Sequence, residues 1–229
     1  MSSLHWSMLE LTHSPHDCMA PADPQLPEQL AARLARGTCL AASREFESEL
    51  GYGRHHGPPL STARPAAVLL LLYPTQQGWC LPLTVRPATL AAHAGQISLT
   101  GGAVELNETS QQAALRELDE ELAIAADDIH ILGALPEFYV FISDFRVTPW
   151  VAAAPRRPRF RPNPREVAEV LELPLSWLLD PASVGSTLRS GHGGIQFHSP
   201  HFVLGHHEIW GATSMILATL RALLRDLYV

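Results

Sequence analysis

An uninterrupted apolar run, PAAVLLLLY, occupies residues 65–73. A strand with one face in water alternates apolar and polar residues, whereas a strand covered on both faces stays apolar throughout. The run therefore predicts a central strand buried between two layers of the protein. A turn at residues 76–78 and a second strand at residues 79–85 are expected to follow it.

The other local patterns predict helices and strands in an order that fits a mixed sheet between helices. Apolar spacing and end signals predict helices at residues 27–36, 110–122, 174–179 and 212–228. Strands are predicted at residues 129–135, 138–141, 146–152 and 167–173, and loops at residues 101–102 and 155–164. We expect residues 1–60 to form an extension whose short helix packs on a domain of residues 61–229.

Composition argues against several classes of function. The net charge of −7 disfavours a general nucleic-acid or membrane-surface binder. No apolar stretch reaches the roughly 18 residues of a membrane span, and the first 25 residues lack the pattern of a secretory signal. Three scattered cysteines suggest a reducing, cytoplasmic location. The chain has no lysine, which excludes P-loop and Schiff-base chemistry.

Residues 102–124 carry an unusual concentration of acidic side chains. Glu117, Glu120 and Glu121 are three and four residues apart, so a helix places them on one face. Like charges at that spacing repel, and helix packing alone gives no reason to choose them. A hard divalent cation does, because it binds carboxylate oxygens and bridges to phosphate. The alternative, a solvated acidic helix, explains neither the nearby glycines nor Arg116.

The spacing of these residues resembles the Nudix box of the Nudix hydrolases. Gly102 is followed after five residues by Glu108, and after seven more by the sequence RELDEE, which begins at Arg116. This chain has Ala123 where the family has a glycine. The family's glycine ends the helix in a left-handed backbone conformation. An alanine in that conformation lowers the stability of the protein by about 1 kcal/mol. The resemblance implies an α/β fold, the Nudix-type α/β/α sandwich with a mixed central sheet, and hydrolysis of a pyrophosphate bond in a nucleoside diphosphate derivative.

A second motif, at residues 81–102, resembles the signature of the coenzyme A diphosphatase branch of this family. Ala91 stands where the branch has an arginine, and Leu99 and Thr100 stand where it has Phe-Pro. Residues 143–149, 163–173, 178–181 and 209–217 resemble the same branch. The positions that match the signature are Leu83, Thr84, Arg86, Leu90, His93, Gly95, Gln96, Ile97, Gly101 and Gly102.

The resemblance implies a role for each acidic residue of the motif. The ligands expected to hold Mg²⁺ or Mn²⁺ are Glu117, Glu120 and Glu121, and Glu120 could instead be the general base. Glu166 is a second candidate for the base, with a surface glutamate as the alternative. Glu108 is expected to pair with Arg116 and to hold the loop against the helix.

The resemblance also implies a small-molecule nucleotide substrate, contacted by Arg86, His93, Gly101 and Gly102. Five arginines follow in a proline-rich segment. They could contact further phosphate groups, or they could belong to a solvated loop: Arg156, Arg157, Arg159, Arg161 and Arg165. Coenzyme A or an acyl-coenzyme A, cut into 3′,5′-ADP and 4′-phosphopantetheine, is the first substrate hypothesis. ADP-ribose or a nicotinamide dinucleotide is the second, and a binding module without catalysis is the third. A homodimer is expected.

Several other side chains have structural alternatives. Trp210 is expected to pack in the core, with stacking on adenine as the other possibility. Cys80 lies in an apolar strand and is expected to be a buried thiol. Four histidines near the end of the chain could be zinc ligands by residue type, but their spacing fits no zinc pattern: His198, His201, His206 and His207.

Overall fold

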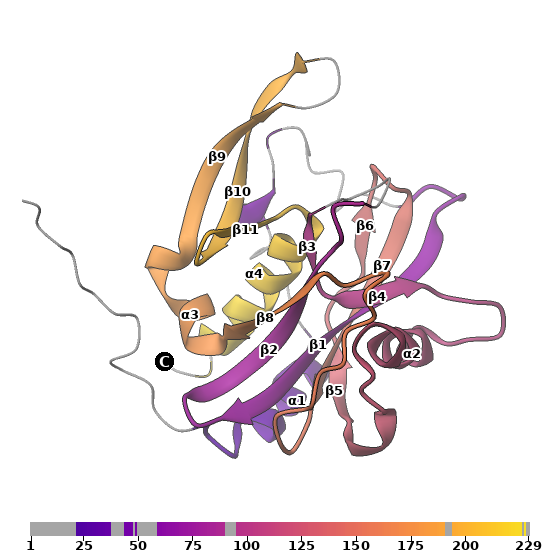
Figure 1. The fold of residues 1–229 in the computed structure, drawn as a ribbon, viewed down its shortest axis with the longest axis vertical. Helices are drawn as coiled ribbons and strands as arrows, with labels where there is room; N and C mark the ends of the chain where they lie inside the picture. The colour runs from indigo at the N-terminus through magenta and orange to yellow at the C-terminus, as the bar shows by residue number, and fades with distance from the viewer. Residues whose placement is uncertain are drawn as a thin grey trace, which may run out of the picture.

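The computed structural model describes residues 22–37, 44–47, 49, 59–89, 95–190, 194–225 and 227 (Figure 1). Its helices are α1 (Leu26–Ala35), α2 (Ser110–Leu122), α3 (Leu175–Leu179) and α4 (Ala212–Arg225), with short 3₁₀ turns at Ala126–Asp128 and Pro181–Ser183. Its strands are β1 (Arg64–Thr75), β2 (Gly78–Val85), β3 (Ile97–Ser98), β4 (Thr100–Ala103), β5 (His130–Ala134), β6 (Phe138–Val140), β7 (Phe145–Ala153), β8 (Glu169–Pro174), β9 (Val184–Ser190), β10 (Gln196–Leu204) and β11 (His207–Trp210).

Strand β1 organises the main sheet. It pairs in parallel with β7 and antiparallel with β4 and β2. The sheet extends outward from these strands, because β2 also pairs with β3 and β8, and β7 also pairs with β5 and β6. The result is an eight-stranded sheet. Its mixed character agrees with the order of elements in the sequence, whereas β3 and β4 were not predicted.

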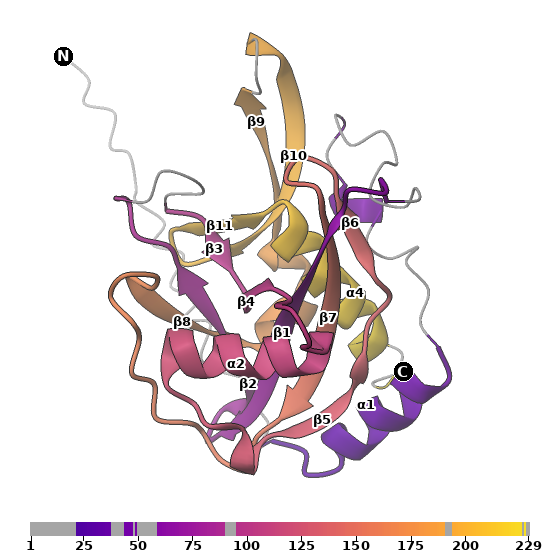
Figure 2. The ribbon, with the colours of Figure 1, turned by 90° about the vertical axis from the view of Figure 1, so that its right-hand side faces the viewer.

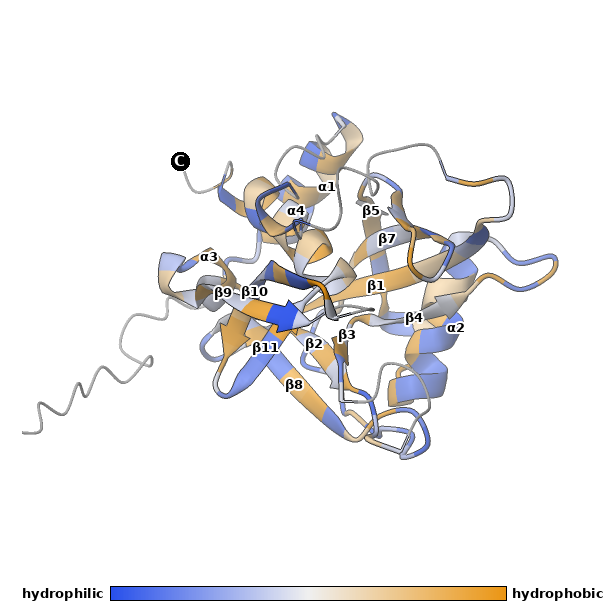
Figure 3. Cartoon of the chain, turned by 90° about the horizontal axis from the view of Figure 1, so that it is seen from above, coloured by the Kyte–Doolittle hydropathy of each residue, from blue (hydrophilic) through white to orange (hydrophobic). Residues whose placement is uncertain are grey.

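Both faces of β1 are covered by helices, which explains its apolar sequence. Leu69 and Leu71 belong to a buried cluster with Leu118 of α2. Leu70 and Leu72 belong to a second cluster, which contains residues of α1, α3 and α4. Successive strand residues point to opposite faces, so residues 66–73 in the middle of this strand are apolar throughout. Figure 3 shows α1 and α4 on one side of β1 and α2 on the other, which confirms the α/β/α sandwich.

The prediction of a loop at residues 101–102 is wrong, because both glycines lie in β4. Gly101 pairs with Val68 of β1, and Gly102 pairs with Ala67. Glycine is rare inside strands because it has no side chain to pack, so the local sequence favoured a loop. Here the glycines allow close approach: a Cβ at Gly101 would lie 2.7 Å from the Cα of Val68.

A second sheet, with strand order β11-β10-β9, was not predicted. Its outer strand, β9, is rich in small and polar residues and alternates between exposed and partly buried positions. Figures 1 and 2 show β9 and β10 projecting from the sandwich, while β11 lies beside the start of α4. The predicted last helix ends three residues early, at Arg225. Among the described residues, no helix has the length and apolar character needed to cross a membrane.

Candidate active site

Helix α2, which carries the acidic motif, has well-defined ends. Thr109 caps its start: the side-chain oxygen accepts from Gln112 N at 3.2 Å, while Gln112 Oε1 accepts from Thr109 N at 2.9 Å. This capping box satisfies two amides that the helix itself leaves unpaired. At the other end Ala123 has φ 53° and ψ 46°, the left-handed conformation expected where the family has glycine.

Arg116 lies at the centre of the charged network on α2. Its Nε donates to Glu108 Oε1 at 2.9 Å, and its Nη2 donates to Glu108 Oε2 and to the carbonyl of Ala103. Its Nη1 reaches Glu117 Oε1 at 2.8 Å and Glu120 Oε2 at 3.0 Å. The hydrogen bond from Arg116 lowers the pKa of Glu108 below its usual range. Arg116 therefore ties the chain before the helix to the acidic face and orients Glu117.

Three carboxylates converge in front of β4. One oxygen each from Glu117, Glu121 and Glu166 lies within 4.8 Å of the others. Glu121 is 5% exposed, and its Oε1 accepts one hydrogen bond, from Gly101 N at 3.2 Å. Burial raises the pKa of Glu121 to about 7, against the lowering effect of that amide, and burial also raises the pKa of Glu117. Glu117 is only partly buried and Glu166 is more exposed, but carboxylates this close repel one another when charged unless a cation joins them.

The donor set and its surroundings fit a hard divalent cation. Carboxylate oxygens are the ligands that Mg²⁺ and Mn²⁺ prefer. Gly102 leaves room for the cluster, because a Cβ on that residue would overlap the Glu117 carboxylate. Within the described residues, no other group of three or more His, Cys, Asp or Glu side chains meets the same criterion. The cluster is therefore the candidate metal site, and the histidines that the structure describes form no such group.

Glu120 lies outside this cluster. Its side chain is 51% exposed and pairs with Arg116, four residues earlier on the helix. Its assignment as a metal ligand or base stays a prediction, and in the structure Glu166 is the third carboxylate beside Glu117 and Glu121. Glu166 comes from the turn before β8, about 45 residues further along the chain. No periodicity in the sequence connects it to α2.

A cavity of about 500 Å³ adjoins the carboxylates. Gly101 and Gly102 form the wall between the two, and Arg86 lines the cavity with its buried Nε making no hydrogen bond to any described residue. His93 lies outside the described residues. Gln96 and Ile97 of the signature and Trp210 also line it. Sequence reasoning missed other lining residues, which come from distant segments: Val140, Ile142, Phe145, Val147, Ala212 and Thr213.

The loop arginines lie elsewhere. Arg156 pairs with Asp128 and Arg157 with Glu172, each at 2.6 Å. Arg159 and Arg161 line a separate polar cavity of about 600 Å³ beyond the end of α2. None of these four side chains lines the cavity beside Gly101. Their role as substrate contacts is therefore not supported by the geometry.

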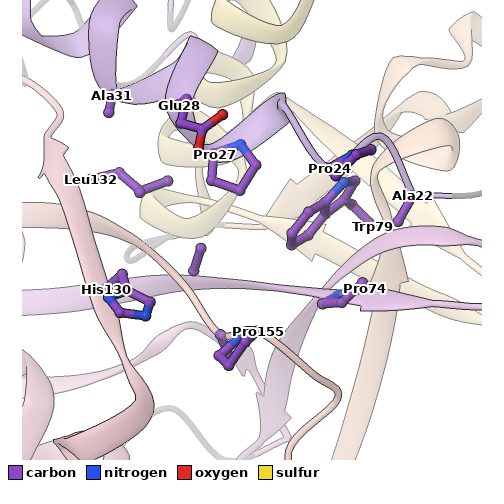
Figure 4. A pocket seen from close by; sticks show the side chains of 12 residues that line it. Ala22, Pro24, Pro27, Glu28, Ala31, Pro74, Trp79, His130, Leu132 and Pro155 are labelled. Carbon is purple, nitrogen blue, oxygen red and sulfur yellow. The ribbon is translucent and has the colours of Figure 1, made fainter.

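Another cavity, of about 450 Å³, lies between α1 and the sheet. Figure 4 shows its lining, which includes several prolines, Trp79, Leu132, Glu28 and His130. Neither the carboxylate cluster nor the signature residues contribute to it. Its walls hold one carboxylate and one imidazole, too few ligands for the cation that the acidic motif implies. The chemistry therefore belongs to the cavity beside β4.

A mixed sheet between helical layers, with a carboxylate cluster on the far side of a glycine-lined cavity wall, defines a candidate metal-dependent hydrolase. Residues 62–186 match the family model described as NUDIX domain. The chain is 42% identical over 120 residues to "Uncharacterized Nudix hydrolase NudL" of Pectobacterium atrosepticum, covering 51% of this chain and 60% of that protein. It is 32% identical over 171 residues to the protein of the same name from Citrobacter koseri, covering 72% and 84%.

A solved structure has a similar fold. The MutT/nudix family protein from Enterococcus faecalis superposes with a TM-score of 0.50 at 16% identity, covering 87% of this chain and 74% of that one. At that identity the likeness concerns the fold alone. The family model and the relatives together show that the chain belongs to the Nudix hydrolases. This membership disfavours the hypothesis of a binding module without catalysis.

Proposed function

We propose that this chain hydrolyses the pyrophosphate bond of coenzyme A or an acyl-coenzyme A, giving 3′,5′-ADP and 4′-phosphopantetheine or its acyl derivative. The observation that carries the proposal is a shared wall. Arg86, Gln96 and Ile97, which match the coenzyme A signature, line the same cavity as Gly101 and Gly102. Gly101 and Gly102 also contact Glu121 and Glu117, which supports the signature and the carboxylate cluster acting on one ligand.

The chemistry of the cavity suits the two parts of such a substrate. Val140, Phe145 and Trp210 give it largely apolar walls, which favour the uncharged pantetheine arm and an acyl chain. Arg86 supplies a guanidinium beside the carboxylates, where a phosphate oxygen can accept from it. The apolar walls and the single arginine together fit a diphosphate joined to a long neutral group.

The departures from the signature lie away from this cavity wherever the structure describes them. Leu99 is 3% exposed and belongs to the main core, where a phenylalanine would serve the same packing. Thr100 is buried in β4 and pairs with Leu69 of β1. Neither residue lines the cavity. Ala91 lies outside the described residues.

We assign Glu117, Glu121 and Glu166 to hold Mg²⁺ or Mn²⁺. A bound divalent cation would neutralise the diphosphate and lower the pKa of the attacking water. The oxygen of this water bonds to one phosphorus, the bond from that phosphorus to the bridging oxygen breaks, and the proton of the water passes to a carboxylate. Arg116 holds Glu117 in place, and the glycines of β4 let the backbone lie close to the diphosphate.

A substrate panel tests this proposal. Coenzyme A, acetyl- and longer acyl-coenzyme A, ADP-ribose and NADH are compared with Mg²⁺ and with Mn²⁺, and products are identified by mass. We expect the highest kcat/KM for a coenzyme A compound, and no activity in excess chelator or in Glu121→Gln. Faster hydrolysis of ADP-ribose or NADH than of every coenzyme A compound would overturn the proposal. The homodimer stays a prediction, which light scattering of the same protein tests.

A further inference from the structure

Asn163 connects helix α2 to the turn that carries Glu166. Its backbone N–H donates to the carbonyl of Glu121 at 2.8 Å. Its own carbonyl accepts from Glu166 N at 3.0 Å and from Val167 N at 2.8 Å. One residue therefore anchors the turn to the helix position that supplies the most buried carboxylate of the cluster.

The side chain of Asn163 makes two further contacts within the turn. Its Oδ1 accepts from Arg165 N at 3.2 Å, and its Nδ2 donates to Glu166 Oε1, also at 3.2 Å. The orientation of the amide is determined by these partners, because the backbone N–H requires the oxygen and the carboxylate requires the NH₂ group. The amide thus shapes the turn and also holds the Glu166 side chain.

Each carboxylate of the cluster has one such hydrogen-bond donor. Arg116 donates to Glu117, Gly101 N donates to Glu121, and Asn163 donates to Glu166. Without a donor, repulsion from the other two carboxylates would favour rotation of Glu166 into solvent. The donor of Glu166 is neutral, so it orients the carboxylate without cancelling the charge that a cation needs.

We infer that Asn163 is a positioning residue that holds Glu166 in the cation-binding arrangement; this rests on the ligand role proposed for Glu166. Groups that orient metal ligands typically contribute 10–100-fold to metal affinity or activity. The neighbouring chain has separate anchors, since Arg161 N donates to the carbonyl of Leu122 and Arg157 forms two hydrogen bonds with Glu172. Loss of the Asn163 Nδ2 donor therefore releases the Glu166 side chain and leaves the loop in place.

Asn163→Ser separates the two functions of the amide. A serine hydroxyl can still accept from Arg165 N, as in other turns of this type, but it is too short to reach Glu166. We expect Mn²⁺ affinity of the substrate-free protein, measured by titration with EPR detection, to fall about 10–100-fold. Circular dichroism should show an unchanged fold and melting temperature. Asn163→Thr repeats the test if the serine variant folds poorly.

A double-mutant cycle shows whether the effect passes through Glu166. Asn163→Ser is compared with Glu166→Gln and with the double variant, and Gln77→Glu in the exposed β1–β2 turn is the control for an amide change elsewhere. We expect the serine change to have no further effect once Glu166 is glutamine. Wild-type Mn²⁺ affinity in Asn163→Ser, or an equal loss in both backgrounds, overturns the inference. Wild-type affinity in Glu166→Gln instead overturns the proposed ligand role itself.

Discussion

Gly102 lies against the carboxylate of Glu117 so closely that a side chain on Gly102 would displace that carboxylate. The contact joins the second residue of a paired glycine segment in β4 to the middle of α2. It explains why a strand position that would ordinarily favour a larger residue holds a glycine. The position of the Glu117 side chain depends on this space.

Replacing this glycine tests that dependence. In Gly102→Ala the new methyl group displaces the Glu117 carboxylate, whose flexible end can rotate away, so the fold is retained. We expect kcat/KM for the substrate that turns over best to fall about 10–100-fold, as for loss of a supporting contact at a metal site. Steady-state kinetics and thermal melting measure the two effects. Wild-type kinetics in a folded variant would show that the position of Glu117 is unimportant.

The three glutamates of the helix should differ in their contribution to cation binding. Glu117 and Glu121 face the cluster, whereas Glu120 pairs with Arg116 at the surface. We expect Glu117→Gln and Glu121→Gln to weaken Mn²⁺ binding at least about tenfold, as loss of a direct ligand should. Glu120→Gln should leave the affinity within about threefold, because exposed ion pairs contribute little. Calorimetric titration measures all three, and equal losses would restore Glu120 to the ligand set.

The raised pKa of Glu121 predicts an unusual dependence of stability on pH. Its pKa is about 7 in the folded, metal-free protein, whereas an unfolded glutamate titrates near 4.3. Between these values the folded state binds more protons than the unfolded state, so stability falls as pH rises toward 7 and then levels off. The shift corresponds to on the order of 3 kcal/mol.

Thermal melting in chelator at pH 5 and pH 8 measures this effect. We expect the wild-type melting temperature to drop between these pH values by several degrees more than that of Glu121→Gln, which cannot titrate there. Mn²⁺ at pH 8 should reverse the drop in the wild type, because binding to the folded state stabilises it. An identical pH profile in the two proteins would refute the assignment of the raised pKa to Glu121.

The end of α2 offers a test of stability without a change in chemistry. Ala123 has a left-handed backbone, which an L-residue with a Cβ adopts at a cost of about 1 kcal/mol. Ala123→Gly should therefore raise the free energy of unfolding by up to about 1 kcal/mol, or the melting temperature by roughly 2–4 °C, with unchanged kcat. The matched control is Ala125→Gly, at a position with φ −68°. That change should be destabilising, since it only adds freedom to the unfolded chain.

Local sequence predicted those parts of the molecule that depend on near neighbours. The bounds of α2 follow from its cap and its periodicity, and the ion pair between Glu108 and Arg116 follows from the motif that the chain shares with its family. The buried thiol of Cys80 was confirmed because a central strand leaves no exposed face.

The remaining features depend on contacts between distant segments. Glu120 shares a helical face with Glu117, but it also lies four residues from Arg116, and that cation holds it away from the cluster. Glu166 enters the cluster only because its turn packs on the end of α2. Nor does any local pattern place Ile142 and Trp210 in one cavity wall, or pair a glycine segment with β1.

Glu121 is tied at both its ends. Its carboxylate binds the amide of β4, and its carbonyl binds the amide of Asn163. Glu121 thereby holds β4, α2 and the turn of Asn163 together. These contacts do not depend on the length of the connections between the three segments. Insertions in the turn after α2, or among the arginines at residues 156–161, should consequently change the outline of the protein while the carboxylate cluster stays assembled. These connections are therefore suitable places to attach a probe or a fusion partner.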